Sequence, residues 1–136
     1  MPGLEDVTPT SFSAQLPYDS RAAARARRLV ADLVERSHPS AELVEDATLV
    51  VHELVVNGLV HGAPDGHDRI EVSGRVEDRE LVISVLDQGT RGTVAAQPLT
   101  DHRTHGRGLA MVDMLSSSWA VDRSAGTRVS ARLALT

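Results

Sequence analysis

An apolar run from Val50 to Gly62, VVHELVVNGLVHG, constrains the fold of this chain more than any other segment. Glu53, Asn57 and His61 follow one another at intervals of four residues. On an α-helix such residues drift around the axis by only about 40° per step and so share one face. The residues around them are almost all apolar: Leu49, Val50, Val51, Leu54, Val55, Val56, Leu59 and Val60. The segment therefore predicts a largely buried helix with one polar stripe.

The polar stripe indicates a binding site. A carboxylate and an amide within an apolar wall are costly to bury unless something satisfies them. A hydrated divalent cation and a phosphate chain would satisfy both groups. The stripe is therefore a candidate site for a phosphorylated ligand with its metal ion.

Composition narrows the classes of protein. A chain of 136 residues suggests one domain. The chain has no lysine, which a Walker-type phosphate loop requires, and no cysteine for disulfides, thiolate metal sites or nucleophiles. A net charge of −5 argues against a general nucleic-acid binder. With no apolar run long enough for a bilayer and no signal peptide at the start, we expect no membrane association and a cytoplasmic location.

Hydrophobic periodicity and turn residues predict the order of the elements. They are a flexible tail at 1–10, a strand at 11–17, a helix from about 20 to 36, a helix from about 41 to 61, a hairpin of strands at 70–76 and 81–86, a polar lid-like loop at 90–104, a helix from 108 to about 117, and strands at 119–122 and 127–135. This order predicts an α+β two-layer sandwich over residues 11–136, with a mixed sheet covered by helices on one face.

Two further segments are candidates for chemistry. Asp87 and Gly89 end an apolar strand, where a carboxylate can accept a hydrogen bond from an exocyclic amine and glycine lets backbone approach a ligand. A plain strand-ending turn explains the same pattern. Gly106 and Gly108 flank the start of the last predicted helix, and backbone N–H groups at a helix N-terminus bind anions. Taken alone, a Gly-x-Gly pair is a weak signal.

Together and in this order, the E-x-x-x-N helix, the strand ending in D-x-G, the lid, the G-x-G-L helix and a terminal G-T strand resemble the GHKL ATP-binding domain. The resemblance runs from about residue 11 to 135. It implies the Bergerat-type ATP-binding fold, a two-layer α/β sandwich. The segments HELVVNGLVHG, GRGLAMVDML and GTRVSARL are most similar to the stand-alone bacterial anti-sigma factors with serine kinase activity.

The resemblance implies roles for individual residues. Glu53 would be the general base that takes the proton from an attacking hydroxyl. Asn57 would bind the Mg²⁺ that bridges the phosphates of ATP. Asp87 would hold the adenine amino group, Gly89 would shape the pocket beneath the ring, and Thr127 would support the adenine through its hydroxyl.

The phosphate side of the site is implied in the same way. The end of the lid would be formed by Gly106, Arg107, Gly108 and Leu109. Arg91 stands where the family usually has a second glycine, and its position suits contact with phosphate. His61 has three readings: a helix C-terminal residue interacting with the dipole, a residue lining the nucleotide pocket, or a metal ligand.

The resemblance implies an ATP- and Mg²⁺-dependent protein serine/threonine kinase that regulates transcription. Its substrate would be a serine or threonine of an anti-anti-sigma factor, its sequestered partner a sigma factor, and its assembly a homodimer. The alternative is a non-catalytic module of the same fold that acts only by binding a partner protein.

Overall fold

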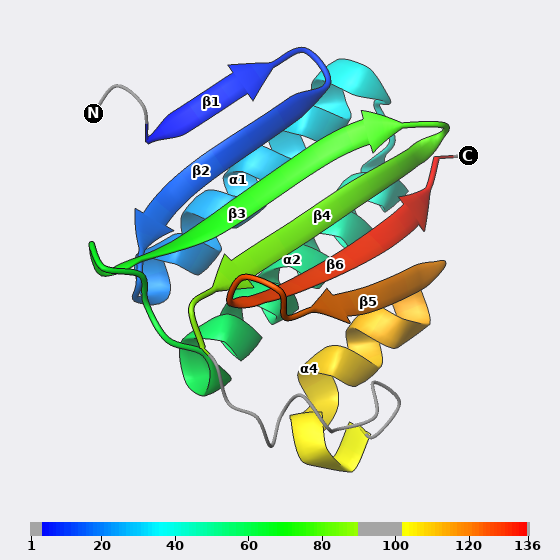
Figure 1. The fold of residues 1–136 in the computed structure, drawn as a ribbon. Coiled ribbons are helices and arrows are strands. Elements are labelled where there is room, and N and C mark those ends of the chain that lie inside the picture. The colour runs from blue at the N-terminus through cyan, green and yellow to red at the C-terminus, as the bar shows by residue number, and fades with distance from the viewer. Residues whose placement is uncertain (1–3, 90–101, 136) are drawn as a thin grey trace.

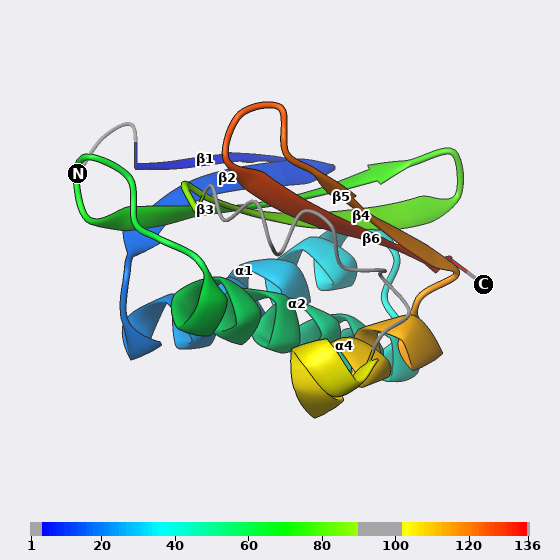
Figure 2. The ribbon, with the colours of Figure 1, turned by 60° about the horizontal axis from the view of Figure 1, so that its bottom comes forward.

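The computed structural model describes residues 4–89 and 102–135, and for 102–108 it describes the backbone alone. Its elements are β1 (Glu5–Thr8), β2 (Ser11–Pro17), α1 (Ser20–Ser37), α2 (Ala41–His61), β3 (Arg69–Glu77), β4 (Glu80–Asp87), α4 (His102–Leu115), β5 (Ser118–Asp122) and β6 (Thr127–Ala134). The strands form one layer and the helices lie together on one face of it (Figures 1 and 2). The predicted α+β two-layer sandwich is confirmed.

Within the described residues the sheet has six strands in the order β1-β2-β3-β4-β6-β5. All of its pairings are antiparallel, so the expectation of a mixed sheet is corrected. β6 lies between β4 and β5, which places Thr127 directly opposite Asp87. This pairing across forty residues of sequence is the first step in building the site.

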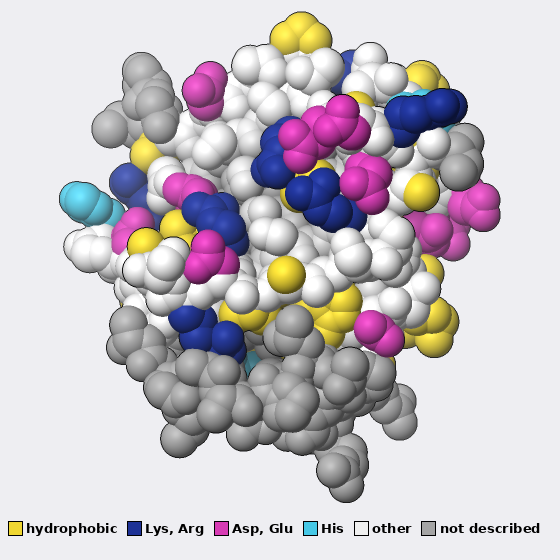
Figure 3. Space-filling model, turned by 45° about the vertical axis from the view of Figure 1, so that its right-hand side comes forward, with side chains coloured by type: hydrophobic (Ala, Val, Ile, Leu, Met, Phe, Trp, Pro, Cys, Tyr) yellow, Lys and Arg dark blue, Asp and Glu magenta, His cyan; other side chains and the backbone are white. Residues whose placement is uncertain are grey.

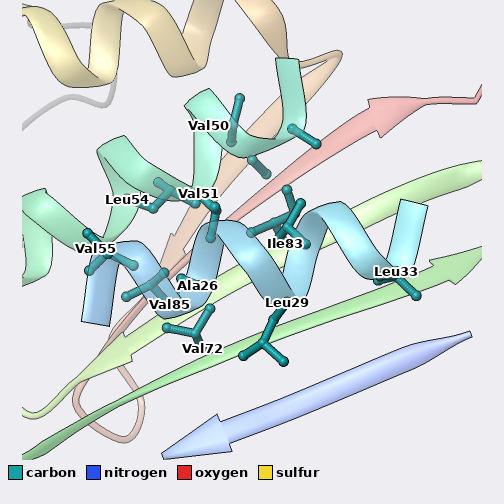
Figure 4. Close-up of a cluster of buried hydrophobic side chains, with 14 of the residues drawn as sticks. Ala26, Leu29, Leu33, Val50, Val51, Leu54, Val55, Val72, Ile83 and Val85 are labelled. Atoms are coloured by element: carbon teal, nitrogen blue, oxygen red, sulfur yellow. The ribbon is translucent and has the colours of Figure 1, made fainter. Parts of the chain in front are cut away.

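The core lies between the sheet and the helices. Alternate residues of β3 and β4 point toward the helical layer, as the period of two in their sequences predicts. Figure 4 shows side chains from two helices and two central strands meeting in this layer: Ala26, Leu29, Leu33, Val50, Val51, Leu54, Val55, Val72, Ile83 and Val85. Each large apolar side chain buried in this way contributes about 1.5–3 kcal/mol. The long valine-rich face of α2 is therefore held firmly against the sheet.

The opposite face of the sheet is polar. Ser84 of β4 and Ser130 of β6 share a hydrogen bond of 2.8 Å. Arginine and glutamate side chains form ion pairs beside them, Arg128 with Glu71 and Arg132 with Glu80. Figure 3 shows positive and negative side chains intermixed on this side of the molecule. The helical face of the sheet is therefore where the apolar core forms and where the candidate site is positioned.

Two boundaries differ from the sequence expectation. Residues Glu5–Thr8, expected within a flexible tail, instead pair with β2 as an edge strand. All four are exposed, so they carry no apolar alternation that a sequence pattern could reveal. The last helix begins at His102 and not at Gly108, so Gly106 and Gly108 lie inside α4. The lid expected at 90–104 otherwise falls outside the described residues.

Candidate functional site

Helix α2 carries the polar stripe, and its two ends are set by local sequence. The hydroxyl of Ser40 caps the first turn by accepting a hydrogen bond of 3.2 Å from the Leu43 amide. The helix ends at His61, with Gly62 as the C-cap. Glu53, Asn57 and His61 are all half-buried, at the margin between the core face and solvent. His61 stands in the last turn of the helix, and none of its three readings is tested by this position alone.

The stripe faces away from α1. A nitrogen of the Arg27 guanidinium in α1 lies 2.6 Å from Nδ1 of His52, so His52 faces α1. At about 100° per residue, Glu53 lies about 100° and Asn57 about 140° around the axis from His52, on the other flank of α2. Helix α4 packs on that flank, and Figure 2 shows α2 between α1 and α4. Glu53 and Asn57 therefore lie toward the α2–α4 side of the helical layer.

Asp87 is buried at the end of β4, with 4% of its surface exposed. Its Oδ1 accepts hydrogen bonds from the amide of Gly89 at 2.6 Å and from the amide of Ala63 at 3.3 Å. The amide of Gln88 in turn donates to the Ala63 carbonyl at 2.8 Å. The carboxylate is thus fixed by the segment that directly follows α2, and the C-terminal end of α2 lies near the end of β4 (Figure 1).

Glycines surround the Asp87 carboxylate. A Cβ atom at Gly62 would lie 2.5 Å from Oδ1 of Asp87, and one at Gly89 would lie 2.7 Å from the same atom. Real Cβ atoms do not approach so closely. The missing side chains therefore let the backbone at Gly62 and Gly89 pack directly on the carboxylate, which holds this acceptor in place.

Thr127 completes this cluster from β6. Thr127 is 8% exposed, and its hydroxyl donates to the Gly89 carbonyl at 2.8 Å. Gly126, before it, has φ of +80°, and a Cβ there would overlap with the Asp87 carbonyl oxygen. The structure therefore brings together Asp87, Gly89 and Thr127, three of the residues that the sequence singled out.

The remaining sequence candidates lie farther along the chain. Leu109 is 3% exposed, and its side chain packs α4 onto the hydrophobic core. Gly106, Arg107 and Gly108 lie within α4, where only the backbone is described. Arg91 falls outside the described residues. Their predicted contacts with phosphate stay predictions.

Sequence reasoning missed three residues that lie against the Asp87 carboxylate: Gly58, Gly62 and Ala63. A signal was available for Gly58, because a glycine in a helix interior costs about 1 kcal/mol relative to alanine and often marks a close approach. A Cβ at Gly58 would lie 2.8 Å from Ile70 of β3, so the glycine lets α2 lie close on the sheet. No local pattern indicates Ala63, since its role depends on the backbone path alone.

In the described part of the chain, no helix is both long enough and apolar enough to cross a lipid bilayer.

Comparison with known proteins adds three findings. A family model described as a histidine kinase-like ATPase domain matches residues 16–133. An anti-sigma F factor of Clostridium acetobutylicum is 34% identical over 64 residues, which are 47% of this chain and 45% of that relative. The chain thus aligns with less than half the length of this curated relative.

The structural comparison extends over more of the chain. A crystal structure of the RsbU and RsbW domains of Rv1364c from Mycobacterium tuberculosis matches 92% of this chain and 32% of that chain. The TM-score is 0.71 and the sequence identity is 21%. At this identity the likeness concerns the fold.

Proposed function

We propose a function from the premise that the chain belongs to the histidine kinase-like ATPase domain family. We infer that it is an ATP- and Mg²⁺-dependent protein serine/threonine kinase that acts as an anti-sigma factor. It would transfer phosphate to a serine or threonine of an anti-anti-sigma antagonist and sequester a sigma factor. The similarity to an anti-sigma F factor over 64 residues supports this choice within the family. A homodimer is part of the proposal.

The observation that carries the proposal is the buried Asp87 with its glycine surround. Its Oδ1 is held by the amides of Ala63 and Gly89, and the backbone at Gly62 and Gly89 packs on the carboxylate because both residues lack a Cβ. A carboxylate fixed in this way would accept a hydrogen bond from an adenine amino group. The residues of the chain therefore fit the base of ATP.

The polar stripe on α2 would contact the phosphate end of ATP. When bound, ATP supplies the phosphoryl group, and Mg²⁺ neutralises charge on its phosphates. Asn57 would offer its amide oxygen to the metal, in keeping with the few protein ligands that Mg²⁺ takes beside phosphate oxygens. Glu53, one turn earlier, would accept the proton of the attacking hydroxyl. Both side chains are half-buried, which keeps them at the site margin and within reach of a ligand.

Nucleotide binding is tested first with a matched pair of variants. Asp87→Asn keeps an oxygen for the Gly89 amide but removes the charge that would hold the adenine amine. Asp122→Asn is the control, because Asp122 likewise ends a strand and accepts a hydrogen bond of 2.8 Å from the amide two residues on, Ser124. In isothermal titration with ATP we expect Asp87→Asn to bind about tenfold more weakly or worse, and Asp122→Asn to match the unaltered chain. Equal affinities for both variants would contradict the assignment of Asp87.

Phosphoryl transfer is tested with radiolabelled ATP and candidate anti-anti-sigma proteins. A general base contributes about 10²–10⁴-fold to the rate, so Glu53→Ala should bind ATP normally and lose at least about 99% of the transfer. The control is Glu45→Ala, an exposed carboxylate on the same helix. Tight binding of a partner without any transfer would favour the non-catalytic module instead.

A further inference from the structure

The last turn of α2 is capped by a side chain from another part of the chain. The final carbonyls of a helix have no partner within it and need one from elsewhere. The Tyr18 hydroxyl, in the segment between β2 and α1, donates to the Gly58 carbonyl at 2.6 Å and lies 3.3 Å from the Leu59 carbonyl. The Gly62 amide donates to the same Gly58 oxygen at 2.9 Å. Tyr18 therefore fixes the turn that leads into Gly62.

The same turn also contacts the sheet. Without side chains, Gly58 and Gly62 lie close against Ile70 and the Asp87 carboxylate. The next residue, Ala63, donates its amide to Asp87. The end of α2 thus contacts both the Tyr18 hydroxyl and the candidate adenine acceptor, Asp87.

Tyr18 is itself firmly placed. Its amide donates to the Asp68 carbonyl at 3.0 Å, which ties it to the loop before β3. Its ring is half-buried and packs against the hydrophobic core. It stands directly before Asp19, the N-cap of α1. A movement of the hydroxyl relative to the sheet would require several of these contacts to change together.

We propose that Tyr18 is a positioning residue for nucleotide binding. Its hydroxyl sets the end of α2 at the distance from β4 at which Asn57 and Asp87 engage the two ends of one nucleotide. This inference rests on the proposed function, because it assigns Tyr18 a role in that same site. Tyr18 would act through Gly58 and the turn that follows it.

The test compares two variants, each of which removes one hydroxyl group. Tyr18→Phe removes the donor to the C-terminal turn of α2 and keeps the ring. Ser37→Ala is the matched control, because the Ser37 hydroxyl donates to the Leu33 carbonyl at the C-terminal turn of α1. Each variant loses one hydroxyl donor at the C-terminal turn of a helix. Only Tyr18→Phe loosens the helix end that carries the stripe.

Titration calorimetry with Mg²⁺ and ATP, and thermal melting, are run on both variants and on the unaltered chain. We expect Tyr18→Phe to weaken ATP binding by about three- to tenfold, the range for one lost hydrogen bond, and Ser37→Ala to leave it unchanged. If transfer is measured, the KM for ATP should rise while kcat stays within about twofold, because Glu53 lies farther up the helix.

The outcomes separate the two proposals. If the unaltered chain binds no ATP, the proposed function and this inference both fall. If it binds ATP and Tyr18→Phe binds equally well, only the inference is overturned. If Ser37→Ala weakens binding as much as Tyr18→Phe, the effect is a general loss of stability and the positioning role is likewise overturned.

A second measurement does not depend on the folding of a variant. Tyr18 is the single tyrosine of the chain, so growth with 3-fluorotyrosine labels this position alone. Because the hydroxyl contacts the turn that binds Asp87, its fluorine resonance should shift on titration with ATP and saturate at the calorimetric Kd. A resonance that stays unchanged at saturating ATP would overturn the inference.

Discussion

Replacement of Gly62 by alanine tests the packing on which the candidate site depends. Gly62 is the C-cap of α2, with φ of −94° and ψ of −160°, a conformation that alanine adopts without strain. The added methyl group would nevertheless lie 2.5 Å from Oδ1 of Asp87 and would overlap with the carboxylate carbon and with the Gly58 carbonyl oxygen. Two of these neighbours belong to the buried carboxylate and one is backbone, so none can rotate away.

The expected magnitude follows from two opposing effects. Overpacking a well-ordered site costs about 1–3 kcal/mol. Alanine in place of glycine restricts the unfolded chain and returns about 0.4–1 kcal/mol. The free energy of unfolding should therefore fall by about 1–2 kcal/mol, which lowers Tm by about 3–8 °C for a chain of this size. Because the displaced group is Asp87 itself, ATP affinity should fall by about tenfold or more.

Gly66→Ala provides the matched control. Gly66 follows Gly62 by four residues, and a Cβ there would meet no atom within 4 Å. Its stability should be unchanged or slightly raised, and its ATP affinity should equal that of the unaltered chain. Urea denaturation followed by the fluorescence of Trp119 measures the first quantity, and calorimetry the second. If Gly62→Ala matched Gly66→Ala in both, the close approach of α2 to Asp87 would be refuted.

Three further predictions concern the metal, the core and the edge strand. Asn57→Ala should remove the part of ATP affinity that depends on Mg²⁺, measured by calorimetry with and without the metal; an unchanged affinity for Mg·ATP would contradict the assignment. Leu54→Ala, at 1% exposure in the core, should lower the free energy of unfolding by about 2–5 kcal/mol in urea titrations; a loss below about 1 kcal/mol would contradict the tight packing of α2. The hydrogen bonds from Arg25 hold the pKa of Glu5 below its usual value. This stabilisation is present above the unfolded pKa and is lost as the pH falls through the folded one, so acidification from about pH 5 to 3 should destabilise the unaltered chain slightly more than Glu5→Gln. The two proteins should differ in this loss of unfolding free energy by less than about 1 kcal/mol, because the ion pair is exposed. If acidification destabilised Glu5→Gln more than the unaltered chain, the prediction would be refuted.

The amino-acid sequence alone predicted the local features of the fold. Ser40 and the Gly62 region bracket α2, and the alternation of apolar residues along β3 and β4 defines their buried face. These signals are local, because a capping hydroxyl or a period of two acts within a few residues. The stripe of Glu53, Asn57 and His61 is of the same kind, since helical geometry alone places the three side chains on one face.

Other features left no local signal. The four exposed residues of β1 become a strand only through pairing with β2. The start of α4 at His102 was not predicted, because its first residues are polar and its two glycines are poor helix formers. Both elements depend on partners elsewhere in the chain, and a short window of sequence does not contain them.

The sequence by itself determined which residue types the candidate site has and which turn, strand end or helix face carries each of them. Only the tertiary structure decided which of them meet. β6 inserts beside β4 and brings Thr127 opposite Asp87, the backbone at Ala63 reaches the Asp87 carboxylate, and Tyr18 closes the last turn of α2. The physical reason is that propensity and periodicity act over a few residues, whereas these contacts join segments 24 to 40 residues apart through the packing of one core.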